Sequence, residues 1–310
     1  MNSKPKTYRS NGKLLLTAEY AVLDEAKALA IPTKYGQSLL VKANDSNIIN
    51  WKSYNELGAI WFECHISFNE IATTDLNSPA LNDVKERLLQ ILKATQSLNS
   101  EFLVSNQGYD ITTHQDFNRL WGLGTSSTLI NNIANWANVD AYQLLKKTFG
   151  GSGYDIACAQ NDTSITFQLQ ADQNPLVTSV NFQPLFKDHL YFVYLNQKQN
   201  SREGILAYKS LGKIDSKITS KIDAITEEMI TCTSLSEFEN LIEAHEKIVS
   251  NLIEQDPIKT RLFSDFKGAV KSLGAWGGDF VLVASNTNPT AYFNAKGFDT
   301  VIRYVDMVLV

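Results

Sequence analysis

The chain has 310 residues, of which 44% are hydrophobic and 20% charged, enough apolar material for a core and no sign of disorder. Its 28 basic and 33 acidic residues give a net charge of −5 without any Lys/Arg block, so we expect no nucleic-acid partner. No long apolar run occurs, the first ten residues lack the apolar centre of a signal peptide, and three widely spaced cysteines favour reduced thiols. These features predict a soluble cytoplasmic protein without a membrane partner.

Hydrophobic periodicity predicts the elements of the first half. Strand-like stretches occur over residues 13–23, 27–33 and 36–44. Leucine, isoleucine and valine at helical spacing predict a helix over 79–98, with Ser78 and Pro79 as its start. Alternation over 101–106 and 108–117 indicates a hairpin. Further helices are predicted after Gly124 and over 139–149, and a helix over 155–160 belongs to the structural alternative for Asp155.

The second half alternates strands and helices, which is typical of an α+β protein. Strands are predicted over residues 164–170, 189–195, 279–285 and 301–310. Two or three helices are expected between residues 202 and 273, and a short helix over 290–297. The polar stretch 171–188, which contains two prolines, is interpreted as the crossing to a second domain. The domains are therefore expected to span residues 1–183 and 184–310.

The stretch "GLGTSSTLIN", residues 122–131, combines two glycines, three hydroxyl residues and the start of an apolar helix. A helix N-terminus offers unpaired amides and the positive end of the helix dipole, and glycines let the backbone approach an anion. The stretch could therefore hold a polyphosphate. The structural alternative is a glycine turn with a hydroxyl N-cap. The stretch lacks the GK[ST] ending of a Walker A loop.

Three further stretches carry residues suited to phosphate chemistry. In "GGSGYDIA", residues 150–157, Asp155 could orient a hydroxyl or metal, or merely cap a helix. Lys13 follows Gly12 at a strand entry, where a lysine could reach a phosphate or simply be solvated. The glycines of "GAWGGDF", residues 274–280, fit either a binding loop or a tight turn.

Together the motifs "NGKLLLTAEYAVL", "RLWGLGTSST" and "GAWGGDF" resemble, in order, those of the GHMP kinase superfamily, the galacto-, homoserine, mevalonate and phosphomevalonate kinases. The resemblance runs from residue 10 to residue 285. It implies an α+β fold with an N-terminal domain like ribosomal protein S5 domain 2 and a ferredoxin-like C-terminal domain. It also implies a kinase that uses ATP and Mg²⁺ to phosphorylate a small-molecule acceptor, as a monomer or homodimer.

The flanking residues are most similar to those of phosphomevalonate kinases, a group of the mevalonate pathway of isoprenoid biosynthesis. Mevalonate kinases usually carry His and a metal-binding Glu at positions where this chain has Tyr20 and Leu144. Asp155, as a base, instead favours an alcohol acceptor, because a phosphate acceptor is already anionic at pH 7. Mevalonate kinase, or another GHMP kinase acting on an alcohol or sugar, therefore remains the alternative. The chain departs from the family at Ala18, where the family has Gly, and at Trp276, where it has a small residue.

The resemblance assigns roles residue by residue. The ATP phosphates would lie against Gly122, Leu123, Gly124, Thr125, Ser126 and Ser127. Lys13 and Asp155 would be catalytic, and Ser126 and Glu19 would serve the metal. The acceptor would contact Tyr20, Ser152, Gly153, Lys198, Ser201, Arg202, Ala275, Trp276 and Gly277. Trp276 could cover the acceptor as a lid or pack into the core.

A hypothesis of another class is a catalytically inactive ATP-binding sensor, against which the presence of both Lys13 and Asp155 argues. Other conspicuous residues are interpreted structurally. Cys64 and His65 are expected to pack in a strand, and His245 to lie solvated on a helix. Trp51 and Trp61 could flank an adenine but are interpreted as core or edge residues.

Overall fold

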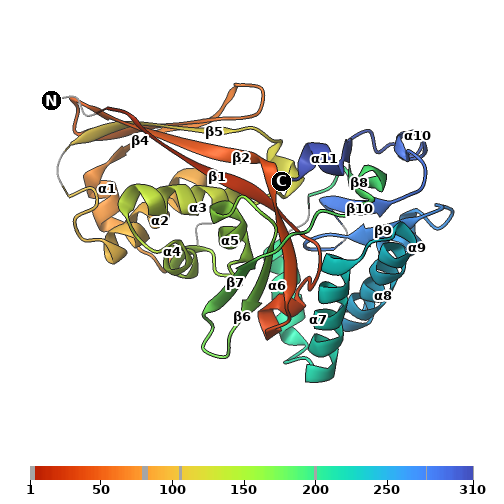
Figure 1. Cartoon of the computed structure of the whole chain (residues 1–310). Coiled ribbons are helices and arrows are strands. Elements are labelled where there is room, and N and C mark those ends of the chain that lie inside the picture. Colours follow the sequence, from red (N-terminus) through yellow and green to blue (C-terminus); the bar gives the residue numbers. More distant parts are fainter. Residues whose placement is uncertain (1–3, 79–82, 105–106, 199–200, 277, 310) are drawn as a thin grey trace. The chain divides into compact units, whose positions relative to one another are not determined.

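The computed structural model of the chain describes residues 4–78, 83–104, 107–198, 201–276 and 278–309, with residues 201 and 202 described by their backbone (Figure 1). It divides into two compact units. Unit 1 contains residues 1–12, 35–119 and 124–160, and unit 2 contains residues 13–34, 120–123 and 161–310. Two strands run from one unit into the other, β1 (Lys6–Leu15) and β2 (Ala28–Asn44).

Unit 1 is a sheet covered by helices. Its other strands are β3 (Ile48–Tyr54), β4 (Ile60–Ser67) and β5 (Gly108–Gln115). Strand β3 pairs antiparallel with β4 and parallel with β5, which in turn pairs antiparallel with β2. The helices are α1 (Phe68–Thr73), α2 (Val84–Leu98), α3 (Thr125–Ala137), α4 (Ala141–Thr148) and α5 (Tyr154–Gln160). Figure 1 shows α2 and α3 along one face of the sheet, and the core lies between them.

The amphipathic helices of unit 1 follow their sequence pattern. Helix α3 buries Ile130, Ile133 and Ala137 in the core, where they meet strand residues such as Ile49 and Ile111. Burial of each isoleucine side chain contributes about 1.5–3 kcal/mol. The periodic spacing of these residues therefore both forms the helix and fixes which of its faces meets the sheet.

Unit 2 contains two sets of strands. Near its beginning, β2 pairs antiparallel with β6 (Ile165–Leu169), which pairs with β7 (Pro175–Ser179). The remaining strands are β8 (Leu190–Tyr194), β9 (Ala269–Ser272), β10 (Phe280–Ala284) and β11 (Val301–Arg303). The helices are α6 (Ser201–Ser210), α7 (Ser216–Thr231), α8 (Leu235–Ile253), α9 (Ile258–Leu262), α10 (Thr290–Ala295) and α11 (Tyr304–Met307).

The strands of the second set form an antiparallel sheet in the order β11-β8-β10-β9. With α6–α9 between β8 and β9, and α10 between β10 and β11, this is the β-α-β-β-α-β arrangement of a ferredoxin-like fold. Strand β8 is buried on both faces: Val193 belongs to a cluster with Phe263 and Phe293, whereas Phe192 stacks on Tyr304. The α+β class and the ferredoxin-like arrangement predicted from the sequence are confirmed.

Several local predictions for the first half are wrong. Strand β1 ends at Leu15, and the next residues make a turn and a short 3₁₀-helix, Ala21–Asp24. Helix α2 begins at Val84 with Asp83 as its N-cap, not at Ser78; residues 79–82 lie outside the described part. Instead of forming a hairpin with 101–106, β5 pairs with β2 and β3, because long-range partners complete its edges.

The second half also departs from the prediction in three places. The stretch interpreted as a crossing contains β7, whose Pro175 lies at the strand's start, where it breaks no central ladder. Between residues 202 and 273 the described chain forms α6, α7, α8 and α9, one helix more than expected. Strand β11 stops at Arg303, and α11 follows because Tyr304 and Met307 are buried by packing that the alternation does not reveal.

Candidate active site

The strand end that carries Lys13 lies beside the beginning of the glycine loop, which we define as residues 122–127. The amide of Lys13 donates a hydrogen bond of 3.0 Å to the carbonyl of Leu123. Leu123 is fully buried, whereas Lys13 is half-buried. The structure therefore brings Lys13 together with Gly122 and Leu123, all within unit 2.

Asp279, at the end of the third glycine motif, meets the glycine loop at Gly122. Gly122 has a φ of +67°, and a Cβ there would overlap the Asp279 carboxylate. Asp279 is held by its backbone, since its amide donates to the Gln197 carbonyl at 2.6 Å and its carbonyl accepts from the Leu195 amide at 2.8 Å. The glycine loop and the motif GAWGGDF thus meet at Asp279, a residue to which the sequence analysis assigned no role. Its place directly after two glycines was the available signal.

The other half of the glycine loop begins α3 in unit 1. Gly124 is the N-cap residue, with a φ of +93°, and no side-chain hydrogen bond caps this end in the part of the chain described. Thr125 accepts instead from the Gln115 side chain at 2.8 Å. Ser127 is buried, whereas Ser126 is exposed. The hydroxyl N-cap considered as the structural alternative is therefore absent, and the first-turn amides have the arrangement that favours an anion.

A buried polar network holds α3 against the strands of unit 1. The Ser10 hydroxyl donates to Asn132 at 2.8 Å and accepts from Asn131 at 2.9 Å. Thr128 donates to the Gln37 side chain at 2.8 Å, and Asn132 donates to the Gln37 carbonyl at 2.9 Å. Buried polar groups with satisfied partners make a unique arrangement, so this network fixes the orientation of the first turn of α3.

The second glycine motif precedes α5 in unit 1. Gly150, Gly151 and Gly153 all have positive φ, and a Cβ on Gly153 would lie 2.9 Å from the Tyr142 ring. Asp155 is half-buried in the first turn of α5, one residue after the start of the helix. Ser152 accepts from the Tyr154 amide at 3.5 Å. Asp155 is thus inside the helix and not its N-cap, and its catalytic role stays a prediction.

Glu19, Lys271, Glu246 and His245 form a fully or almost fully buried cluster in unit 2. Lys271 Nζ lies 2.5 Å from Glu19 Oε1 and 3.6 Å from Glu246 Oε1. His245 Nε2 lies 3.5 Å from Glu19 Oε2 and accepts from the Ala18 amide at 2.9 Å. The prediction that His245 is solvated is wrong, because α8 turns this position into the core. Lys271 lies three residues before the motif GAWGGDF, and the sequence analysis assigned it no role.

The cluster holds two carboxyl groups and one lysine, and burial decides their protonation. Burial raises the pKa of Glu246 to about 7, although Lys271 opposes the shift. Burial also raises the pKa of Glu19, while the charge and hydrogen bond of Lys271 lower it in part. Burial and then Lys271 lower the pKa of His245 well below its usual value. The arrangement is therefore a buried Glu19–Lys271 pair beside a neutral histidine and a readily protonated Glu246.

Tyr20 and Trp276, both predicted to contact the acceptor, lie in one cluster of unit 2 with Tyr208 and Val249. The rings of Tyr20 and Tyr208 stack with centroids 5.5 Å apart, and the Tyr208 hydroxyl donates to Asp24 at 2.5 Å. Trp276 is 2% exposed, and its Nε1 has no hydrogen-bond partner among the residues that the structure describes. Trp276 is therefore packed inside unit 2, on α8 and the tyrosines.

The other residues predicted for the acceptor are distributed over several elements. Ala275 is buried beside Trp276, and Lys198 is exposed after β8. Ser201 and Arg202 open α6, but their side chains and Gly277 lie outside the described residues. Trp51 is a core residue of unit 1. The Arg119 Cζ lies over the Trp61 ring, 3.5 Å from its centroid. Both tryptophans therefore have the structural roles that the sequence predicted. His65 is exposed and hydrogen-bonded to Asn50 at 2.8 Å.

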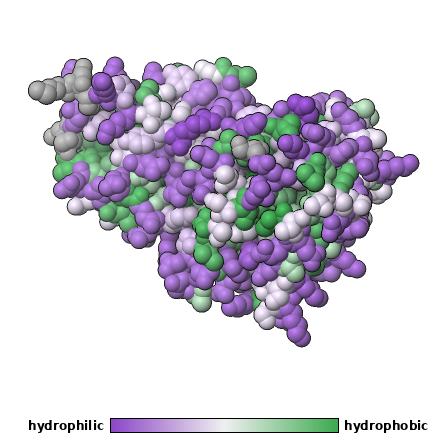
Figure 2. All heavy atoms as spheres, viewed as in Figure 1, coloured by the Kyte–Doolittle hydropathy of each residue, from purple (hydrophilic) through white to green (hydrophobic). Residues whose placement is uncertain are grey.

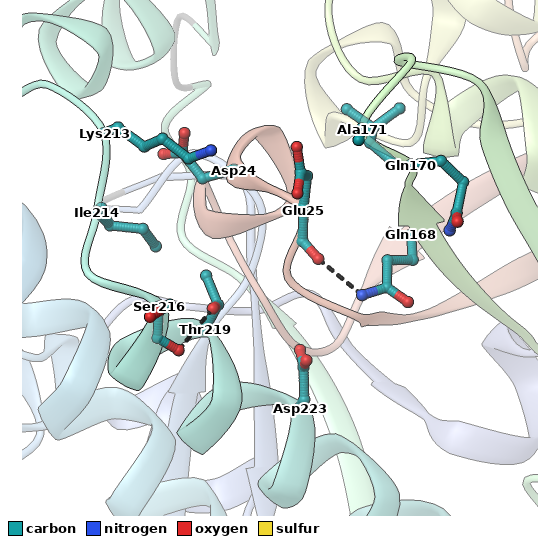
Figure 3. A pocket seen from close by; sticks show the side chains of 11 residues that line it. Asp24, Glu25, Gln168, Gln170, Ala171, Lys213, Ile214, Ser216, Thr219 and Asp223 are labelled. Carbon is teal, nitrogen blue, oxygen red and sulfur yellow. Dashed lines mark hydrogen bonds between the residues drawn. The ribbon is translucent and has the colours of Figure 1, made fainter.

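A polar pocket of about 360 Å³ lies elsewhere in unit 2 (Figure 3). It is lined by Asp24, Glu25, Gln168, Leu169, Gln170, Ala171, Lys213, Ile214, Ser216, Thr219 and Asp223. Asp24, which lines this pocket, accepts a hydrogen bond from Tyr208, and none of the residues that line the pocket belongs to a glycine motif.

The face of the molecule in Figure 2 is mainly hydrophilic. No helix among the described residues is long and apolar enough to cross a membrane.

The described residues contain no cluster of three or more His, Cys, Asp or Glu suited to a metal ion. Ser126 offers an exposed hydroxyl, whereas the carboxylate of Glu19 is paired with Lys271. Mg²⁺ commonly keeps several waters and binds through substrate phosphates with few protein ligands. The residues therefore fit a magnesium ion carried by a nucleotide better than one held in a protein cage.

No protein-family model matches the sequence, and a search of curated proteins found no significant match. Solved structures do match it. The mevalonate kinase of Methanococcus jannaschii is 17% identical, with a TM-score of 0.73 over 99% of both chains. A Streptococcus pneumoniae phosphomevalonate kinase bound to phosphomevalonate and AMPPNP is 16% identical, with a TM-score of 0.66 over 98% of both chains. A Lactococcus lactis galactokinase complexed with galactose is 10% identical, with a TM-score of 0.70 over 99% of this chain and 96% of that one.

These structures are mevalonate, phosphomevalonate and galactose kinases, and the likeness to each covers nearly the whole of this chain. At this identity the likeness concerns the fold. The resemblance predicted from the glycine motifs is thereby confirmed at the level of the fold: the chain has the fold of the GHMP kinases.

Proposed function

We propose that the chain is an ATP-dependent phosphotransferase of the GHMP kinase superfamily, acting on a small-molecule acceptor. The observation that carries the proposal is the contact between the glycine loop and the motif GAWGGDF, at Gly122 and Asp279, on a chain with this fold. The support for phosphate binding comes from the other end of the glycine loop, where the uncapped N-terminus of α3 offers amides and the positive end of a helix dipole. We further propose that the protein works in the cytoplasm, as a monomer or homodimer.

Phosphoryl transfer depends mainly on positioning and on electrostatic stabilisation of the charge that develops. We assign the roles of the site residues on this basis. The backbone amides of Gly122, Leu123, Gly124, Thr125, Ser126 and Ser127 would bind the ATP phosphates. Lys13 would neutralise the transferring group, and Asp155 would orient the acceptor or take its proton. Mg²⁺ would reduce the charge on the phosphates, with the Ser126 hydroxyl beside it. Glu19 would act indirectly, through its pair with Lys271.

We propose phosphomevalonate as the acceptor, on the flanking similarity to phosphomevalonate kinases. The position of the metal-binding Glu of mevalonate kinases is Leu144, which is fully buried in the core of unit 1 and supports this choice. Ser152, Gly153, Tyr20, Ala275 and Gly277 would contact the acceptor, whereas Trp276 would support Tyr20 from within their shared cluster. Lys198, Ser201 and Arg202 would bind its anionic group, since a phosphate acceptor must be held against its repulsion from ATP.

The proposed domain boundary between residues 183 and 184 follows the family fold. It divides the chain by function, with the ATP-binding part first. The two compact units divide it by contacts instead: residues 161–183 and the segment 13–34 group with the C-terminal part. Separate expression of residues 1–183 and 184–310 would test the boundary by whether each piece unfolds cooperatively.

The function is tested by ADP release, measured with mevalonate, phosphomevalonate, homoserine and galactose as acceptors. We expect turnover with phosphomevalonate, and phosphorus NMR of the product should show a new diphosphate. Turnover with mevalonate alone would keep the kinase and change the acceptor. ATP binding without turnover on any acceptor would favour the inactive sensor, and the absence of ATP binding would overturn the proposal.

A further inference from the structure

The turn that follows β1, defined as residues 18–20 and called here the left-handed turn, has a backbone that its residues disfavour. Ala18 and Tyr20 both have a φ of +62°. For residues with a Cβ this region is strained, and it persists only where surrounding contacts impose it. The GHMP motif has Gly at the position of Ala18, so the left-handed φ explains the family residue. This chain keeps the conformation without the glycine.

The contact that holds Ala18 comes from a distant helix. The Ala18 amide donates to His245 Nε2 at 2.9 Å, and both residues are fully buried. Within the turn, the Ala21 amide donates to the Glu19 carbonyl at 2.7 Å and the Val22 amide to the Ala18 carbonyl at 2.9 Å. The bond to His245 fixes the Ala18 peptide plane, and the turn's own hydrogen bonds fix the residues that follow, so a change of φ at Ala18 would break one or the other and leave a buried N–H without a partner.

His245 can accept this bond because it is neutral. Burial lowers its pKa, and Lys271 adds repulsion against a second proton. Since Nε2 accepts, the proton of the neutral ring lies on Nδ1. Lys271 fixes the next residue of the turn by its 2.5 Å contact with the Glu19 carboxylate. Two successive residues of the turn are thus held by α8 and β9.

The turn determines where the Tyr20 ring lies. The ring stacks on Tyr208, and its hydroxyl lies against Gly204 of α6, where a Cβ would overlap it. Because the side chain leaves the backbone directly after Glu19, a change of φ at Ala18 would swing it out of this stack.

We propose that His245 is a positioning residue, which holds the left-handed turn through the Ala18 amide and thereby places Tyr20 in the acceptor site. The clamp stands on the contacts above, whereas its effect on the acceptor rests on the proposed function.

The first experiment is a double-mutant cycle between positions 18 and 245, measured by urea denaturation. His245→Phe keeps an aromatic ring but cannot accept the bond, and Ala18→Gly removes the strain. We expect Ala18→Gly to raise the urea midpoint in the wild-type background, and by less in the His245→Phe background, because an Ala18 released from the clamp can already relax out of the strained φ. His245→Gln, which offers another acceptor, should lose less stability than His245→Phe. Equal shifts from Ala18→Gly in the two backgrounds would overturn the clamp.

A second measurement uses the unmodified chain and does not depend on a variant folding. In ¹⁵N NMR spectra at pH 7, the His245 ring should show an unprotonated Nε2 and a protonated Nδ1. A proton on Nε2 would contradict the clamp.

The third readout is kinetic and uses whichever acceptor the wild type phosphorylates. His245→Phe should raise the acceptor KM about tenfold while kcat changes much less, since misplaced binding groups weaken acceptor binding. Ala18→Gly should restore part of the KM in the double variant. His189→Phe is the control, because it removes a histidine contact to the Ser285 carbonyl elsewhere in unit 2. Unchanged KM in His245→Phe would overturn the positioning role.

The readouts separate the two proposals. If the wild type phosphorylates no acceptor, the proposed function fails, and the denaturation cycle and the NMR spectrum still decide the clamp. If the wild type is active and the cycle shows no coupling, the clamp fails and the kinase assignment stands.

Discussion

Two segments of this chain adopt left-handed backbone conformations by different means. The glycine loop uses Gly122 and Gly124, whose φ values are +67° and +93°, and needs no buried partner for either conformation. The left-handed turn uses Ala18 and Tyr20 at +62° and lies under a buried histidine and a buried ion pair. Glycine adopts such a conformation with little strain, whereas a residue with a Cβ requires tertiary contacts to keep it.

The difference predicts where each segment is vulnerable. The glycine loop should fail when a side chain is added, because its glycines leave room for a close approach. The turn should fail when a partner is removed, because the partner opposes the strain. The following four predictions test and extend this contrast, in order of decreasing expected effect.

Lys271→Ala should have the largest effect, on stability. It leaves the Glu19 carboxylate buried without its partner, since both side chains are 0% exposed. Removing one member of a buried pair costs about 3–5 kcal/mol. Urea denaturation should show this loss. Lys259→Ala, which removes a surface pair with Glu243 at 2.8 Å, should cost about 1 kcal/mol or less. Similar losses in the two variants would mean that the buried pair does not support the turn.

Lys13→Ala and Asp155→Asn should impair catalysis and leave folding largely intact, since both side chains are only half-buried. Loss of charge stabilisation at a transferring group costs roughly 3 kcal/mol, or about a hundredfold in kcat. ADP release gives kcat, and calorimetry should show nearly normal ATP binding. Lys42→Ala, an exposed lysine of β2, is the control. Wild-type turnover in both variants would refute the assigned roles.

Gly122→Ala should weaken ATP binding and stability, because the new Cβ meets the Asp279 carboxylate. Gly58→Ala is a matched control: its φ is +74°, and nothing lies within 4 Å of a Cβ there. Both variants carry the left-handed strain of about 1–2 kcal/mol, and only Gly122→Ala adds the overlap, about 1–3 kcal/mol more. Denaturation and ATP calorimetry measure the two effects. If the variants lose equally, the contact with Asp279 does not constrain the loop.

Glu246→Gln should change the pH dependence of stability. Burial raises the Glu246 pKa to about 7, so the folded chain binds a proton that the unfolded chain has released above its ordinary value near 4.5. This contribution to stability is complete below pH 4.5 and disappears as the pH rises through 7. Glutamine cannot titrate, so the stability advantage of the wild type over the variant should shrink between pH 5 and pH 8.

His245 acts in the opposite direction, because its pKa is lowered and its contribution disappears as the pH falls below about 6.5. The comparison with Glu246→Gln cancels this effect, since both proteins contain His245. Thermal unfolding at several pH values is the measurement. A difference that does not change with pH would show that Glu246 does not titrate in this range.

The sequence by itself determined the parts of this protein that depend on local pattern. Periodic apolar residues predicted α3 and α4, and an unbroken apolar run predicted β8. Three motifs in order carried the resemblance to the GHMP kinases, and it was this resemblance that implied the two-domain fold.

Tertiary structure decided what local pattern could not express. Whether residues 16–25 continue β1 depends on His245 and Lys271, which lie more than 220 residues away and hold the turn from α8 and β9. The same helix buries His245, whose sequence neighbours Glu243 and Lys247 are charged and suggested a solvated face. Asp279 meets Gly122 only once β10 and the glycine loop are folded. Partners distant in sequence impose these conformations, so only the folded chain reveals them.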